Sequence, residues 1–242
     1  MSSLYSVIIP AYNEEALLPR TLSLLAAAMS SLGAAGEVIV VDNNSTDATA
    51  ELARRAGARV VSEPVNQISR ARNAGARAAT TGRFVFLDAD TLPSAELLAA
   101  AMAKLDAGSA GGGAFIELAI DGPASPAHRF LPALSWLLMK MGICGGSFMF
   151  CRRDAYEDIG GFSEKVFAAE DVFMSRALRS WGKKNRRSFD ILVDTPIRSS
   201  DRKLHLHSPA KLSFYLLLFA VFPFAVRYKS FCRLWYHRPD SR

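Results

Sequence analysis

The amino-acid sequence predicts an α/β fold in which helices cover both faces of a mostly parallel sheet. Two observations carry this prediction. Short apolar runs alternate with longer helical patterns through the first hundred residues, and such alternation is typical of βαβ units with right-handed crossovers. The 242-residue chain is 50% hydrophobic and 21% charged, which indicates one large globular domain.

The first half of the chain is predicted to hold four strands, each followed by a helix. Apolar runs that end at proline or at polar residues predict strands at residues 7–10, 37–41, 59–62 and 84–87. Helical patterns follow these strands, the first reaching residue 32 and the others at 48–56, 67–80 and 96–107. The run at 84–87 is apolar throughout, which indicates a strand buried on both faces.

A glycine-rich stretch at residues 108–113 is interpreted as a flexible break between two halves of the domain. Beyond it, the patterns predict a strand at 114–120, a loop at 121–126, a helix at 129–141, a strand ending near 150, a short helix from 154, a helix at 172–181 and a strand at 186–193. We divide the chain into residues 1–107, residues 108–207 and a tail at 208–242.

The net charge and the cysteine content indicate which partners and which cellular compartment to expect for this protein. A formal net charge of +6 and a pI ≈ 9.4 favour anionic partners such as nucleotides, phospholipids or nucleic acid. The arginines are scattered and not interleaved with an aromatic platform, so nucleic-acid binding is not expected. Three cysteines without metal-type spacing indicate a reducing compartment, and no secretion signal opens the chain, so we expect a cytoplasmic protein.

Two carboxylates, Asp88 and Asp90, follow the strand predicted at 84–87. Because side chains alternate along an extended chain, residues two apart point the same way and can share one hard cation, with Ala89 facing away. The carboxyl ends of strands are also where open α/β sheets bind their ligands. The alternative is that one of these aspartates caps the next helix.

Four stretches of the sequence resemble, in order and spacing, the motifs of the family 2 glycosyltransferases, which have the GT-A fold: residues 7–15, 41–49, 66–91 and 145–171. The resemblance implies a Rossmann-like sheet and transfer of a sugar from a nucleotide-sugar donor to an acceptor hydroxyl. A UDP-sugar is the commonest donor in such enzymes, followed by a GDP-sugar. Residues 1–107 would bind the donor, and 108–207 would form the acceptor-binding and catalytic half of the same domain.

The resemblance assigns the nucleotide to the ends of the first strands and to the region leading to Asp90. A nucleotide base needs a flat contact and polar partners at its edge, which these positions can supply. For two residues another role stays open, since Glu14 can favour the first turn of a helix and Arg70 can be a solvated surface charge. The assigned residues are Pro10, Ala11, Tyr12, Glu14, Asp42, Arg70, Asp88 and Ala89.

The Asp-x-Asp pattern of Asp88 and Asp90 resembles a site where Mn2+ or Mg2+ bridges the diphosphate of the donor. A divalent cation stabilises the negative charge that gathers on the leaving diphosphate. His205 is a candidate third metal ligand, with a surface histidine as the alternative. The basic stretch with Arg202 and Lys203 resembles a loop that closes over the diphosphate.

The pair Glu170 and Asp171 resembles the acidic residues that the family places at the start of a helix beneath the acceptor. Asp171 is the candidate base for the acceptor hydroxyl, and one base with a single displacement implies inversion at the anomeric carbon. Glu170, Gly145 and Gly146 are expected near the sugars. The alternatives are a helix cap with a first-turn acid for the acidic pair, and an ordinary tight turn for the glycines.

The tail is predicted to be helical, with an apolar run at residues 212–226 flanked by lysines and arginines. This run is too short to span a bilayer comfortably. Its mixture of aromatic and basic residues across 211–236 suits peripheral contact with the inner face of the cell membrane. The alternative is that it packs on the core or on a second subunit of a homodimer. The acceptor itself, whether a sugar, a lipid or a small molecule, has no recognisable motif.

Two other functions fit the same general architecture. A sugar-phosphate nucleotidyltransferase would carry a glycine-rich loop with an arginine after its first strand, and residues 11–14 lack one. A non-catalytic nucleotide-sugar-binding protein would not need the acidic motifs, and Asp88, Asp90 and Asp171 are all present. We therefore predict a metal-dependent, inverting glycosyltransferase.

Overall fold

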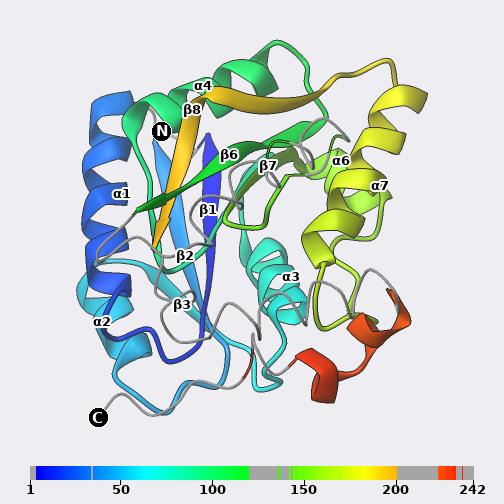
Figure 1. The fold of residues 1–242 in the computed structure, drawn as a ribbon. Coiled ribbons are helices and arrows are strands. Elements are labelled where there is room, and N and C mark those ends of the chain that lie inside the picture. Colours follow the sequence, from blue (N-terminus) through cyan, green and yellow to red (C-terminus); the bar gives the residue numbers. More distant parts are fainter. Residues whose placement is uncertain are drawn as a thin grey trace.

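The computed structural model describes residues 4–33, 35–119, 136, 142, 144–200, 223–232 and 236. In this part of the chain the strands form one eight-stranded sheet in the order β3-β2-β1-β4-β7-β6-β8-β5, and helices lie on both of its faces (Figure 1). The α/β architecture predicted from the sequence is confirmed.

Parallel strands form the N-terminal half of the sheet. They are β1 (Tyr5–Ala11), β2 (Gly36–Asp42), β3 (Arg59–Ser62) and β4 (Arg83–Leu87). The helices between and after them are α1 (Leu18–Leu32), α2 (Thr49–Arg55), α3 (Ile68–Ala78) and α4 (Ala95–Asp106). Because β1 lies between β2 and β4 and runs parallel to both, the carboxyl ends of these three strands meet at one edge of the sheet.

The other half of the sheet mixes parallel and antiparallel pairs. Its strands are β5 (Thr91–Leu92), β6 (Gly111–Ala119), β7 (Phe148–Arg152) and β8 (Phe189–Ser200). β7 runs antiparallel to β4 and β6, whereas β6 and β8 run parallel. The helical elements here are α6 (Arg153–Asp158), α7 (Glu170–Lys184) and the short 3-10 helices η1 (Pro223–Arg227) and η2 (Lys229–Cys232).

The central strands bury side chains on both faces of the sheet. Along β1, Val7 and Ile9 belong to the apolar cluster that contains α1 and α4, whereas Ile8 belongs to the cluster that contains α3 and α7. In β4, Val85 joins the first cluster and Phe86 joins the second. Alternate residues thus enter two different cores, which is why these strands appear in the sequence as continuous apolar runs.

Two predictions for the second half are wrong in their boundaries. The glycines interpreted as a flexible break belong in part to a strand, since β6 already begins at Gly111. A Cβ atom on Gly112 would lie 1.7 Å from the carbonyl oxygen of Asp190 in β8, so glycine is needed where these strands approach each other. The strand predicted at 186–193 runs instead from Phe189 to Ser200.

The loop and helix predicted at 121–126 and 129–141 lie outside the described residues, apart from residue 136. Most of the predicted tail also lies outside the described residues, and its described part consists of residues 223–232, which hold η1 and η2, and Tyr236. Within the described ranges, no helix combines the length and the apolar character that crossing a membrane requires.

Candidate active site

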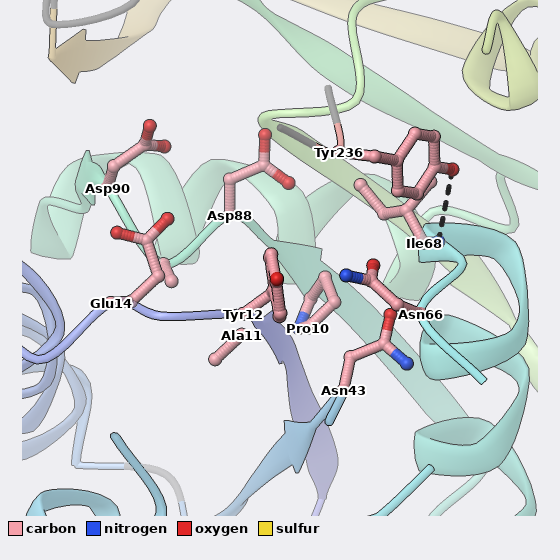
Figure 2. Close-up of a pocket in the computed structure, with 11 residues that line it drawn as sticks. Pro10, Ala11, Tyr12, Glu14, Asn43, Asn66, Ile68, Asp88, Asp90 and Tyr236 are labelled. Atoms are coloured by element: carbon pink, nitrogen blue, oxygen red, sulfur yellow. Dashed lines mark hydrogen bonds between the residues drawn. The ribbon is translucent and has the colours of Figure 1, made fainter. Parts of the chain in front are cut away.

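A pocket opens at the edge of the sheet where β1, β2 and β4 end (Figure 2). Ligands of open α/β sheets bind in this position, just outside the carboxyl ends of the strands. The pocket is lined by Pro10, Ala11, Tyr12, Glu14, Asn43, Asn66, Ile68, Asp88, Ala89, Asp90 and Tyr236. It therefore brings together six of the eight residues predicted to bind the nucleotide, and both predicted metal ligands that the structure describes.

The loop after β1 carries Tyr12 and Glu14 and is tied to the loop after β2. Asn13 has a φ of 50°, a left-handed conformation that asparagine tolerates better than most residues. Its Oδ1 accepts a hydrogen bond from the Thr46 backbone N–H at 2.9 Å, and the Glu14 N–H donates to Thr49 Oγ1 at 2.8 Å. These bonds hold the pocket-lining residues at the end of the sheet.

Asn43, which the sequence analysis did not select, lines the pocket next to the predicted Asp42. The Asn43 side chain donates to the carbonyl oxygens of Glu63 and Val65, at 3.0 and 2.6 Å, and accepts from the Gln67 N–H at 2.9 Å. It thereby fixes the loop that leads into α3. Asp42 lies outside the pocket lining, and its carboxylate accepts a hydrogen bond from the Ser45 N–H at 3.1 Å.

Asp88 and Asp90 both line the pocket, Asp90 with an exposed fraction of only 4%. The turn that carries them is fixed by Thr21, whose hydroxyl donates to the carbonyl oxygens of Ala89 and Thr91 at 2.8 and 2.9 Å. The alternative that one of these aspartates caps the next helix is wrong, because Ser94 caps α4 and accepts a hydrogen bond from the Leu97 N–H. Neither aspartate is thus used as the cap of α4, and both line the pocket.

Arg72 on α3 connects this edge of the sheet to α7. Its side chain is 1% exposed and donates to Asp88 at 2.9 Å, to Glu170 at 2.8 Å and to the Gly146 carbonyl oxygen at 2.9 Å. Burial by itself would lower the pKa of Arg72, but Asp88, Glu170 and Asp171 raise it above the usual value. The guanidinium therefore stays charged and joins the two halves of the domain.

On α3 the predicted nucleotide-binding residue is Arg70, whereas the arginine that joins Asp88 to Glu170 is Arg72. On a helix, residues two apart point to nearly opposite sides, and Arg70 pairs with Glu63 and Glu164, at 3.1 and 3.2 Å, outside the pocket lining. These ion pairs agree with the alternative of a partly solvated charge, and contact of Arg70 with a nucleotide stays a prediction. The buried residues Ser69 and Ala76 lie three residues before and four after Arg72. This helical spacing of small residues is the signal that places Arg72 on the buried face.

The helix predicted at 172–181 begins earlier, so Glu170 and Asp171 lie in the first turn of α7, and neither is its cap. The N-cap position is held by Ala169 in a left-handed conformation, with a φ of 60° and no side-chain cap. Asp171 accepts hydrogen bonds from the N–H groups of Gly146 and Val172, both at 2.8 Å. In the first helical turn, both carboxylates also lie where the helix dipole favours negative charge.

The environment raises the pKa of both acids. Burial, with the neighbouring charge of Asp171, raises the pKa of Glu170 to about 7 against the opposing effect of Arg72. Burial also raises the pKa of Asp171, although Arg72 and two backbone N–H groups oppose this shift. Asp171 is partly exposed, whereas Glu170 is buried against Arg72. Of the two carboxylates, Asp171 is thus the more exposed.

The paired glycines before β7 have close protein neighbours. A Cβ atom on Gly146 would lie 2.8 Å from Arg72 Nη2, and one on Gly145 would lie 2.2 Å from Ile116 Cδ1. The backbone N–H of Gly146 also donates a hydrogen bond to Asp171, and its carbonyl oxygen accepts one from Arg72. These glycines allow Arg72 and Ile116 to pack closely, and their contact with a sugar stays a prediction.

The remaining predicted residues, His205, Arg202 and Lys203, lie outside the described part of the chain. Among the described residues, no cluster of three or more acidic, histidine or cysteine side chains forms a complete metal site. Asp88 and Asp90 nevertheless offer two carboxylates to one pocket, and hard cations such as Mn2+ and Mg2+ take such oxygen ligands together with substrate phosphates. The residues present therefore fit a cation that is held jointly by the protein and a diphosphate.

The model of the family described as "Glycosyl transferase family 2" matches residues 6–160, which is more than half of the chain. Over 104 residues the chain is 42% identical to an uncharacterized glycosyltransferase of Mycobacterium tuberculosis, a match that covers 43% of this chain and 44% of that protein. Over 99 residues it is 43% identical to the undecaprenyl-phosphate 4-deoxy-4-formamido-L-arabinose transferase of Pseudomonas paraeruginosa, covering 36% of this chain and 28% of that one. The match thus spans less than half the length of these relatives.

Among solved structures, the fold is similar to that of a mannosyltransferase from Pyrobaculum calidifontis in complex with GDP-Man and Mn2+. The TM-score is 0.63 at 19% sequence identity, and the similarity covers 97% of this chain and 74% of that chain. At this level of identity the likeness shows the shared GT-A fold.

Proposed function

This chain belongs to glycosyl transferase family 2, and we propose that it moves a sugar from a UDP-sugar or, as second choice, a GDP-sugar to an acceptor hydroxyl with inversion. The observation that carries this proposal is the pocket at the carboxyl ends of β1, β2 and β4. It combines flat and amide side chains, suited to a nucleoside, with the acidic pair Asp88 and Asp90, suited to a cation and its diphosphate.

Asp88 and Asp90 would hold Mn2+ or Mg2+ on the donor diphosphate. Such a cation would stabilise the negative charge that develops on the leaving nucleoside diphosphate. The protein contributes the position of the two carboxylates, because Thr21 fixes their turn and Arg72 orients Asp88. The mannosyltransferase of Pyrobaculum calidifontis, solved with a nucleotide sugar and Mn2+, supports this choice of cation.

Asp171 is proposed as the base that takes the proton from the acceptor hydroxyl. Its raised pKa makes it a better proton acceptor than an ordinary surface aspartate. The N–H groups of Gly146 and Val172 hold its carboxylate in one orientation, while Glu170 is engaged by Arg72. A single base on the acceptor side supports one displacement, and therefore inversion of the anomeric carbon.

We further propose that the acceptor is met at the inner face of the cell membrane. In the described tail, Phe224 and Phe231 are 57% and 45% exposed beside the exposed Arg227. Aromatic rings next to basic side chains suit the interface of an anionic membrane. The Pseudomonas relative is named as a transferase to undecaprenyl phosphate, which supports a lipid acceptor here. If this face bound a second copy instead, the protein would be a homodimer.

The test of the donor site is calorimetric binding of UDP and of GDP, with and without Mn2+. We expect one nucleotide to bind in a Mn2+-dependent manner, and Asp90→Asn to abolish that dependence. Asp90 is preferred to Asp88 for this test because Asp88 also pairs with Arg72. The matched control, Glu51→Gln, changes an exposed acid on α2 and should bind as the wild type does. A folded wild type that binds neither nucleotide would refute the proposal.

A further inference from the structure

Ten of the residues that line the pocket come from the first ninety of the chain, and one, Tyr236, comes from the tail (Figure 2). The Tyr236 hydroxyl accepts a long hydrogen bond from the Ile68 N–H, at 3.5 Å. Its ring makes an edge contact with Phe167, with the centroids 5.9 Å apart, and Lys229 Nζ lies 5.1 Å from its centroid. Tyr236 is thus packed in place as part of the pocket wall.

The segment that carries Tyr236 is anchored to the domain by η1 and η2. Val226 and Cys232 are buried in a small apolar cluster with Val166 and Ala168. The Phe167 N–H donates to the Val226 carbonyl oxygen at 2.6 Å, and Lys229 Nζ donates to the carbonyl oxygen of Asn66 at 3.0 Å. The segment therefore contacts both the loop before α7 and the loop before α3.

The pocket has two chemically different sides. Figure 2 shows Glu14 and Asp90 on one side, Asp88 between, and Tyr236 with Ile68 and Asn66 on the other. A cation and the diphosphate belong on the acidic side. The side formed by an aromatic ring, an aliphatic chain and amide groups suits an uncharged, flat group with polar edges, which in a nucleotide is the base. Burial raises the pKa of Tyr236, so its phenol stays neutral there.

We propose that Tyr236 is a donor-binding residue whose ring packs against the nucleoside, and that docking of residues 223–232 holds it in place. This inference rests on the proposed function, since it names a further contact in the same donor site. It makes the tail part of the donor site, in addition to its proposed contact with the membrane. A ring that stacks on a base contributes to nucleotide affinity through its aromatic surface. The affinity should therefore depend on the ring of Tyr236 more than on its hydroxyl.

The test compares nucleotide affinities by calorimetry in the full chain with Mn2+ present, using whichever of UDP and GDP the wild type binds. We expect Tyr236→Ala to weaken binding roughly 5- to 100-fold, the usual loss for an aromatic ring stacked on a base. Tyr236→Phe should bind nearly as the wild type does. The matched control is Tyr228→Ala, because Tyr228 lies in the same segment but is 56% exposed and outside the pocket lining.

A second variant tests the docking. Val226 does not line the pocket, and Val226→Asp places a charge in the apolar cluster against which Tyr236 packs. This variant should weaken nucleotide binding as Tyr236→Ala does. Wild-type affinity in a folded Tyr236→Ala protein would overturn the inference while leaving the proposed function intact. Wild-type affinity in Val226→Asp alone would overturn the role of docking. A wild type without nucleotide binding would refute both proposals together.

Discussion

The two acidic pairs of the site are positioned in different ways. Asp88 and Asp90 follow a buried strand directly, and the turn that holds them is fixed by Thr21 from α1. Glu170 and Asp171 begin a helix, and their position depends on Arg72, which lies 98 residues before Glu170, and on the Gly146 peptide. The first pair is set mainly by its own strand end, whereas the second is assembled by contacts between distant parts of the chain.

The difference has a chemical counterpart. The strand-end pair lines the pocket at the carboxyl ends of β1, β2 and β4, where carboxylates suit a cation. In the helix-start pair, loss of contact with solvent raises the pKa of both acids, the buried Glu170 and the partly exposed Asp171, which suits proton transfer. Arg72 is bonded to a member of each pair, so it is the residue through which a change at one pair reaches the other.

The largest expected effect separates the pairs by function. We expect Asp171→Asn to slow turnover of the donor about 10²- to 10⁴-fold, the range for loss of a general base, and to leave nucleotide affinity unchanged. The measurement is the release of nucleoside diphosphate from the sugar nucleotide whose base the calorimetry identifies. Asp90→Asn is the counterpart, since it should remove Mn2+-dependent binding. Equal loss of nucleotide binding in Asp171→Asn would show that the two pairs act as one site.

The next effect concerns the link between the pairs. Arg72→Ala leaves Asp88 and Glu170 without a buried partner, which typically costs about 3–5 kcal/mol of unfolding free energy. Arg70→Ala removes a partly exposed arginine from the same helix and should cost about 1 kcal/mol or less. Urea unfolding of both variants measures the contrast. If the two variants lost the same stability, Arg72 would not connect the two halves as described.

The smallest effect is a pH dependence that belongs to the helix-start pair. The pKa of Glu170 is raised from 4.5 to about 7, so the folded protein holds this proton more tightly than the unfolded chain does. Between these values the native state binds more protons, and this residue's contribution to stability therefore falls as the pH rises. Below pH 4.5 both states are protonated, so the contribution is complete there.

Unfolding free energies of the wild type and Glu170→Gln, measured from pH 4 to pH 8, isolate this contribution. Glutamine resembles the protonated acid, so the stability of the wild type relative to the variant should fall as the pH rises through this window. Asp154 and Asp190, whose pKa is lowered, make a contribution to stability that rises with pH. Both proteins contain these acids, so their contribution cancels in the comparison. A difference that stayed constant with pH would contradict the raised pKa.

Much of the donor side could be predicted from the sequence, because it depends on short-range patterns. A continuous apolar run predicts a strand buried on both faces, and the polar residues after it must lie at the strand's end. This reasoning located Tyr12 and Asp90 at the pocket. The same patterns do not show which side chain at a strand end or on a helix faces the pocket. Asn43 lines the pocket beside the predicted Asp42, and Arg72 is buried two residues after the predicted Arg70.

The sequence by itself determined the succession of strands and helices along the chain and the place of the acidic motifs, because hydrophobic periodicity and turn residues act over a few positions. Only the tertiary structure decided which distant groups meet. Arg72 reaches Glu170, Gly112 faces β8, and Tyr236 closes a pocket formed by the first ninety residues. These contacts depend on how helices and strands pack in space, and packing between residues far apart in the chain leaves no periodic signal in the sequence.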